Sequence, residues 1–285
     1  GDKHLNNNIG GYLTKRAFLN PNLEAIYDYA TQRRFNFAEL NERANRVANV
    51  ALDAGVKKGD RVALLLMNSV EFVESFFGLA KIGAVVVPLN WRLVPDELAY
   101  IVKDAGATVM VYGSEFADSV ADLHERGEAA TDIHHWYEVG VGGDCQSFAA
   151  HYETDMAKAR ADEVVIAAGD DDLVFIMYTS GTTGLPKGAM HSHATMTWAL
   201  VTIGATADAR FKDRYAIALP LFHVGALTPV IGNIYLGCTT VLMRQFDPRL
   251  MWKIIEQESI STTLAVPAML NFMLQVPELQ TADYS

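Results

Sequence analysis

The alternation of short apolar segments with amphipathic ones is the feature that most restricts the fold of this chain. Residues 61–66 form an apolar run typical of a strand, residues 69–83 have helical spacing with Ser69 as the cap, and residues 84–88 form a second apolar run. A strand, a helix and a strand in this order predict a βαβ unit with parallel strands.

The same alternation continues along both halves of the sequence. Further helices are predicted at residues 37–54, 95–105, 114–128, 192–207, 224–236 and 248–258 and from residue 267 onward, and further strands at residues 108–112, 173–178, 215–220, 238–243 and 261–266. We therefore predict an α/β fold with two mostly parallel sheets, each flanked by helices.

A passage of weaker pattern separates the two halves. Residues 135–169 contain Gly140, Gly142 and Gly143 among many small or polar residues, which favours loops around short elements. We place the domain boundary at its end, with a first α/β lobe over residues 1–168 and a second over residues 169–285. The acidic run 170–172 is interpreted as the solvated entry to a strand rather than a metal site.

Composition excludes several classes of protein. Half of the 285 residues are hydrophobic, enough for a large core, and the net charge of −11 argues against nucleic acid as a partner. Cys145 and Cys238 form no CxxC motif, and the polar start of the chain has no apolar signal segment, so we expect a reducing, cytoplasmic location. Residues 224–243 carry no formal charge, but their glycines and proline favour a buried helix and strand over a membrane span.

The segment Tyr178–Gly188, with the sequence YTSGTTGLPKG, follows a predicted buried strand and carries the main chemical signal. Its glycines permit close approach of the backbone, its hydroxyls and N–H groups can surround an oligophosphate, and Lys187 supplies a compact positive charge. The spacing G-x-x-x-x-G-K-[ST] is not met, because Pro186 stands five residues after Gly181 and Gly188 follows the lysine. The segment predicts a phosphate loop of a different kind.

This loop resembles the signature loop of the adenylate-forming (AMP-binding) enzymes, which include acyl-CoA synthetases, aryl-CoA ligases and luciferases. The resemblance implies that ATP and a carboxylate form acyl-AMP and pyrophosphate, after which coenzyme A displaces AMP. It assigns ATP binding to Thr179, Ser180, Gly181, Thr182, Thr183, Gly184 and Lys187. Within that set, it implies catalytic roles for Lys187 and Thr182 and contact with Mg²⁺ for Thr182, although another threonine could hold the metal.

A second segment, Leu219–Leu227, resembles the part of the family that borders the acyl pocket, which makes His223 and Gly225 the candidate substrate residues. Coumarate ligases typically carry an aromatic residue where this chain has Gly225, so the opening favours a slender alkyl chain. Residues 214–237 and 266–273 are also similar to bacterial fatty acyl-CoA synthetases. We therefore expect a medium- to long-chain fatty acid and coenzyme A as substrates.

Three alternatives remain open at the level of sequence: an aryl- or coumarate-type CoA ligase, a fatty acyl-AMP ligase, and a half-length paralogue that binds acyl chains or partners without catalysis. The family's later segments, including a metal-binding glutamate and a C-terminal domain with a lysine, are not found in the chain. The resemblance thus implies an N-terminal fragment that is inactive alone. The lobe face left uncovered predicts self-association, such as a homodimer.

Three further groups of residues carry weaker signals. His191 and His193 could ligate a metal, but we favour a structural role because no carboxylate or cysteine lies beside them. Arg210, Lys212 and Arg214 form a basic cluster that could contact an anionic membrane surface or coenzyme A, or simply a solvated turn. Arg244 is a further candidate for coenzyme A.

Overall fold

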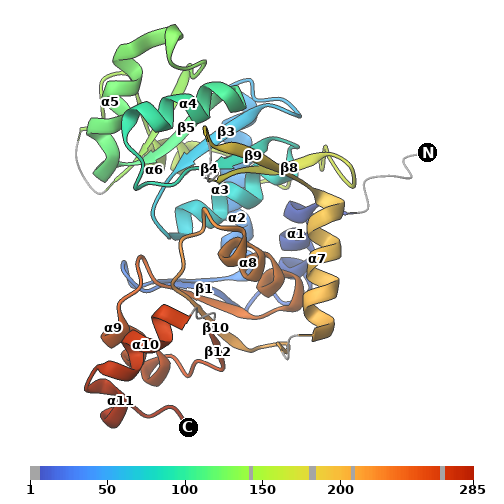
Figure 1. The fold of residues 1–285 in the computed structure, drawn as a ribbon. Coiled ribbons are helices and arrows are strands. Elements are labelled where there is room, and N and C mark those ends of the chain that lie inside the picture. Colours follow the sequence, from blue (N-terminus) through green and yellow to red (C-terminus); the bar gives the residue numbers. More distant parts are fainter. Residues whose placement is uncertain (1–6, 141–143, 180–183, 207–208, 264–266) are drawn as a thin grey trace. The chain divides into compact units, whose positions relative to one another are not determined.

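The computed structural model describes residues 7–140, 144–179, 184–206, 209–263 and 267–285 (Figure 1). The chain divides into two compact units, which are described separately. The first comprises residues 1–11, 41–67 and 71–198, and the second comprises residues 12–40, 68–70 and 199–285. Each unit contains one β-sheet.

The first unit is built on a seven-stranded sheet with the order β7-β6-β5-β3-β4-β8-β9. The strands pair in parallel except for β8 and β9, which are antiparallel neighbours at one edge. The strands are β3 (Arg61–Leu65), β4 (Val85–Pro88), β5 (Ala107–Gly113), β6 (His135–Val139), β7 (Ala150–His151), β8 (Leu173–Thr179) and β9 (Lys187–Ser192).

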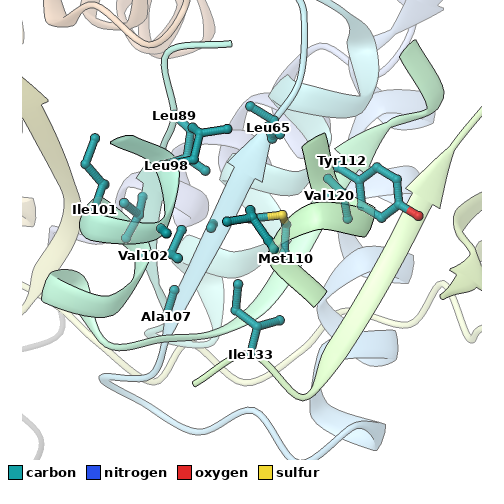
Figure 2. Packing of buried hydrophobic residues seen from close by; sticks show 14 of the residues in the cluster. Leu65, Leu89, Leu98, Ile101, Val102, Ala107, Met110, Tyr112, Val120 and Ile133 are labelled. Atoms are coloured by element: carbon teal, nitrogen blue, oxygen red, sulfur yellow. The ribbon is translucent and has the colours of Figure 1, made fainter. Parts of the chain in front are cut away.

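Helices α4 (Pro95–Ala105) and α5 (Ala117–Arg126) pack on one face of this sheet. Their buried side chains, among them Leu98, Val102 and Val120, meet Leu65 and Met110 from the strands (Figure 2). Short 3₁₀ turns flank α5 at Ser114–Phe116 and Gly127–Ala129. Successive side chains of a strand point to opposite faces of the sheet. The apolar side chains on the other face therefore need a second layer of helices to cover them.

Helices α2 (Phe37–Asp53), α3 (Val70–Lys81) and α6 (Tyr152–Lys158) supply that second cover. Val47 of α2, Leu79 of α3 and Met156 of α6 line a small apolar cavity together with Val62 and Val109 of the sheet. Gly78 permits the close packing of α2 and α3, since a Cβ there would lie 2.3 Å from the Ala44 carbonyl oxygen. The sheet is therefore the middle of three layers.

Buried polar side chains connect α2 and α3 to neighbouring segments of the first unit. Glu74 of α3 is fully buried and accepts two hydrogen bonds from Arg43 of α2 and one from the Tyr152 hydroxyl at 2.6 Å. Lys81 is likewise fully buried and pairs with Glu163 at 2.8 Å. These partners satisfy charges that would otherwise be costly to bury.

The second unit is built on a five-stranded sheet with the order β12-β10-β11-β1-β2. Its strands are β1 (Glu24–Asp28), β2 (Arg33–Asn36), β10 (Arg214–Ile217), β11 (Thr239–Leu242) and β12 (Thr262–Thr263). Among the described residues of this unit, β1 and β2 pair antiparallel and the other neighbours pair in parallel. The second unit also contains helices α8 (Val224–Leu236), α9 (Pro248–Gln257), α10 (Pro267–Gln275) and α11 (Glu278–Thr281). Helices α1 (Ile9–Leu19) and α7 (His193–Thr206) each contribute residues to both units.

The predicted fold class is confirmed, and most predicted elements lie within two residues of the observed ones. Helices α4 and α8 have the predicted bounds. The predicted boundary after residue 168 does not coincide with the division between the units. Strand β8 pairs with β4, with Phe175 next to Val86, so that β8 and β9 belong to the sheet of the first unit. The long sequence separation between β4 and β8 concealed this pairing. Among the described residues, no helix has the length and apolar character needed to cross a membrane.

Candidate phosphate-binding site

Strands β8 and β9 form the two sides of the predicted phosphate loop. Tyr178 lies opposite Gly188 and Thr179 lies opposite Lys187 in the antiparallel pair. Opposite residues of such a pair share one face of the sheet. The fold therefore places the Thr179 hydroxyl and the Lys187 ammonium on the same face, where the loop begins and ends.

The ends of the loop have features that fit an anionic ligand. Thr179 and Lys187 are both exposed, and no acidic side chain among the described residues pairs with the Lys187 ammonium. Gly184 has a φ of 111°, a conformation that residues with a Cβ rarely adopt. An exposed cation beside a hydroxyl and an adaptable backbone is a suitable donor set for phosphate oxygens.

The middle of the loop lies outside the described residues. This applies to Ser180, Gly181, Thr182 and Thr183, and so to the predicted contact of Thr182 with Mg²⁺ and to its catalytic role. The roles assigned to these four residues remain predictions.

The two histidines beyond the loop pack inside the first unit. The His191 ring stacks on Phe175 with centroids 4.5 Å apart, and burial lowers the pKa of His191. His193 is fully buried, and its Nδ1 accepts a hydrogen bond of 3.0 Å from the Ile9 backbone N–H. Burial lowers the pKa of His193 to about 4, so its imidazole is neutral near pH 7. These contacts agree with the structural role favoured from the sequence.

The predicted substrate residues lie in the second unit, at the start of α8. His223 is the N-cap residue of α8, and its carbonyl oxygen accepts from the backbone N–H groups of Ala226 and Leu227. His223 and Gly225 are exposed, and no described heavy atom lies within 4 Å of the position that a Gly225 side chain would take. The helix start thus presents an imidazole beside an unfilled space.

Arg244 borders a hollow of about 350 Å³ in the second unit. Tyr29 follows β1 and Met243 follows β11, so the hollow lies outside the carboxyl ends of two parallel strands. Ligands of open α/β sheets commonly bind at such ends. The position is compatible with the predicted role of Arg244.

The basic cluster is only partly available to a partner. Arg214 donates to the Glu258 backbone carbonyl and forms ion pairs with Glu24 at 3.2 Å and with Glu258 at 2.9 Å. Its guanidinium therefore stabilises the second unit. Lys212 lies over the Phe211 ring, 5.6 Å from its centroid.

Comparison with known proteins defines the family. A family model described as AMP-binding enzyme matches residues 13–285. The chain is an AMP-binding enzyme family member. It is 42% identical over 276 residues to the long-chain-fatty-acid–CoA ligase FadD13 of Mycobacterium tuberculosis. The aligned residues cover 97% of this chain and 53% of that ligase. It is also 35% identical over 281 residues to a feruloyl-CoA synthase from an Amycolatopsis species, covering 98% of this chain and 53% of that enzyme.

Solved structures of a CoA synthetase and a CoA ligase share the fold. A Mycobacterium tuberculosis fatty acyl CoA synthetase matches with a TM-score of 0.90 at 40% identity, covering 98% of this chain and 53% of that one. The anthranilate CoA ligase AuaEII in complex with anthranoyl-AMP matches with a TM-score of 0.89 at 25% identity over the same shares. The chain thus spans about half the length of the curated relatives it matches.

Sequence reasoning missed two parts of the predicted phosphate-binding region. Strand β9, with the sequence KGAMHS, has neither apolar alternation nor a run of β-branched residues, so nothing in its pattern predicts a strand. Asp104 was also overlooked, although its hydrogen bond to Tyr178 reaches the base of the loop. An acidic side chain in the last turn of a helix opposes the helix dipole, and this was the available signal.

Proposed function

We propose that this AMP-binding enzyme chain supplies the ATP-phosphate site of an AMP-forming acyl-CoA synthetase that acts on fatty acids. The observation that carries the proposal is the hairpin base, where Thr179 and Lys187 share one face at the two ends of a glycine- and threonine-rich loop. The similarity to the long-chain-fatty-acid–CoA ligase FadD13 supports the class of acid.

In the proposed reaction, a fatty acid carboxylate attacks the α-phosphorus of ATP, which forms acyl-AMP and releases pyrophosphate. The thiol of coenzyme A then attacks the acyl carbon and displaces AMP. Negative charge that builds up on the departing pyrophosphate is balanced by Lys187 and by hydroxyl and N–H groups of the loop, so catalysis rests on position and electrostatics. No side-chain nucleophile is needed.

Mg²⁺ would supply further positive charge to the phosphates when it is bound. It prefers several oxygen ligands, including phosphate and water, to which one threonine hydroxyl can be added. Thr182 is the proposed donor. The exposed Thr179 hydroxyl and Lys187 ammonium fit the same oligophosphate.

The acid and coenzyme A would use the second unit in this proposal. His223 and Gly225 would border the acyl chain. Glycine at position 225 leaves open the space that an aromatic side chain would fill, and this space suits a slender alkyl group. Arg244, beside its hollow, is the proposed contact for the phosphates of coenzyme A.

The direct test is ATP–pyrophosphate exchange with Mg²⁺ and a series of acids from acetate to palmitate, with coumarate included. We expect the complete gene product to exchange most strongly with medium- or long-chain fatty acids and the 285-residue chain to show little or no exchange. Strongest exchange with coumarate would instead support an aryl-CoA ligase. Absence of exchange with every acid would contradict the proposal and favour an acyl- or partner-binding protein without catalysis.

A matched pair of lysine variants tests the site. Lys187→Met is expected to lower exchange at least about 100-fold, since a charge at the transferring phosphates stabilises the transition state. Lys57→Met removes another exposed lysine of the first unit and should leave exchange unchanged. Equal effects of the two variants would contradict the assignment of Lys187.

Two partner proposals need measurements of their own. Peripheral contact with anionic membranes would use the basic cluster of Arg210, Lys212 and Arg214, of which Arg214 also forms ion pairs within the second unit. Flotation with vesicles that contain phosphatidylserine, compared with neutral vesicles, tests this contact. Homodimer formation is tested by light scattering over a hundredfold range of concentration, in which a constant monomer mass would contradict it.

A further inference from the structure

We propose that Asp104 is a positioning residue for ATP, which acts through Tyr178 to hold the base of the phosphate loop against helix α4. The inference rests on the proposed function and extends it to a residue about seventy positions earlier in the chain. All the residues involved belong to the first unit.

The central observation is a hydrogen bond between two side chains that are distant in sequence. The Tyr178 hydroxyl donates to Oδ2 of Asp104 at 2.7 Å. A hydrogen bond to an ionised carboxylate is shorter and stronger than one between neutral groups. Tyr178 is the residue immediately before Thr179, so this bond holds the strand at the point where the loop begins.

The same tyrosine also fixes the other side of the loop. A Cβ at Gly188 would lie 3.0 Å from Cζ of Tyr178 and 2.8 Å from Cγ2 of Ile176, which shows that the Tyr178 ring lies directly over the Gly188 backbone. Gly188 follows Lys187. One ring therefore contacts both strands next to the two residues proposed to bind phosphate.

Helix α4 is a rigid support for this contact. Its C-terminal end is capped by Gly106 in the left-handed conformation, with a φ of 67°, and the Ala105 carbonyl accepts from Nε of Arg61 at 2.8 Å. Its other face belongs to the apolar cluster of Figure 2, and the Tyr178 ring packs against that cluster. The backbone of Asp104 is thereby held relative to the sheet, while its side chain is exposed and meets Tyr178 at the surface.

The position of Asp104 is unfavourable for the helix itself. It stands one residue before the end of α4, where the carbonyl groups already carry partial negative charge. Such local conflicts tend to occur where a residue serves another purpose. The hydrogen bond to Tyr178 accounts for an acidic side chain at this position, which the helix alone does not explain.

The chemical state of the pair suits a permanent link. Burial and the hydrogen bond to Asp104 both raise the pKa of Tyr178, so the phenol keeps its proton at physiological pH and remains a donor. The hairpin is an edge element in which no residue of β9 is buried, so apolar burial alone gives it little restraint. A side-chain link at its base reduces the motion that ATP binding would otherwise have to suppress.

The test uses four variants of the complete gene product in the exchange assay. Tyr178→Phe and Asp104→Ala remove the link and should each raise the KM for ATP about fivefold, with kcat and the KM for the acid changed less than twofold. Asp104→Asn keeps an oxygen acceptor and should restore most of the ATP affinity. The double variant Tyr178→Phe/Asp104→Ala should be no worse than either single one, because both remove the same bond.

Tyr112→Phe is the control. The Tyr112 hydroxyl donates to Glu138 at 2.7 Å, so this change removes a tyrosine–carboxylate bond of equal length from the buried part of the same sheet rather than from its exposed edge. Tyr112 lies on β5, and the KM for ATP should not change. An equal rise of the KM for ATP in Tyr112→Phe and Tyr178→Phe would mean a general loss of stability and would overturn the inference.

Hydrogen exchange of the 285-residue chain without nucleotide provides a readout that does not depend on activity. Backbone amides of β8 and β9 should exchange faster in Tyr178→Phe and Asp104→Ala than in the wild type, with other strands unaffected. If these amides exchange at the wild-type rate, or if the variants keep the wild-type KM for ATP, the inference about Asp104 is overturned and the proposed function still stands. A wild type that fails to use ATP would overturn the proposed function as well.

Discussion

The centre and the edge of the seven-stranded sheet are held together in different ways. All four residues of β4 are buried, and β4 pairs with a strand on each side. Strand β9 has no buried residue and pairs, among the described strands, with β8 alone. The centre is stabilised by burial of many apolar groups, whereas the edge depends on a few specific contacts, namely those of Tyr178, Gly188 and His191.

This difference separates stability from function in the first unit. A change at the centre removes apolar burial or leaves a charge without a partner, and its cost falls on folding. A change at the edge alters the geometry of Thr179 and Lys187 while most of the core stays intact. The following predictions test this separation, from the largest expected effect to the smallest.

Arg43→Leu should have the largest effect, because it leaves the fully buried Glu74 without its ion-pair partner. Loss of one member of a buried pair costs about 3–5 kcal/mol of unfolding free energy. Urea denaturation measures this cost. The double variant Arg43→Leu/Glu74→Gln should recover at least half of it, since the amide carries no charge and can still accept from Tyr152. No recovery would mean that packing, rather than charge, causes the loss.

Acid should weaken the fold through His193. Its pKa is lowered by burial from an ordinary 6.5 to about 4, so the unfolded chain takes up the proton first as the pH falls. The stability due to the neutral imidazole is complete above pH 6.5 and declines between pH 6.5 and 4, by roughly 3 kcal/mol in all. Urea denaturation across this range should give a smaller pH dependence for His193→Asn. Equal slopes for the two proteins would contradict the prediction.

Gly188→Ala should cost less stability but affect the edge specifically. Its added methyl group would lie 2.8 Å from Ile176 and 3.0 Å from the Tyr178 ring, so the ring must move. Overpacking of this kind costs about 1–3 kcal/mol. We also expect a rise in the KM for ATP that exceeds any change in the KM for the acid. Normal kinetics in a destabilised variant would separate the ring position from ATP binding.

Met190→Thr should have the smallest effect, because the Met190 side chain on β9 is 68% exposed. Surface changes of this kind lie within about 0.5 kcal/mol of zero. Val86→Thr on β4 is the comparison, since it places a hydroxyl at a fully buried position and should cost about 1–3 kcal/mol. Similar midpoints of urea denaturation for the two variants would remove the distinction between centre and edge.

The sequence predicted the central elements well for a physical reason. Residues 61–66 form a uniform apolar run and residues 95–105 have apolar residues at helical spacing. Both patterns arise because the two faces of the sheet are covered, so that burial selects the residue types. Signals were absent for β9, for the two-residue β7 and for α6, where exposure or short length leaves little pattern. The two units also interleave in sequence, which a single boundary after residue 168 could not express.

By itself, the sequence determined the α/β class and the family and predicted the phosphate loop, since these depend on local patterns and on a run of residues whose chemistry suits phosphate. Only the tertiary structure decided that β8 joins the first sheet beside β4, that Thr179 faces Lys187, and that Asp104 reaches Tyr178. These contacts join residues many positions apart, and the free energy that selects them comes from packing of the whole sheet, which no local pattern records.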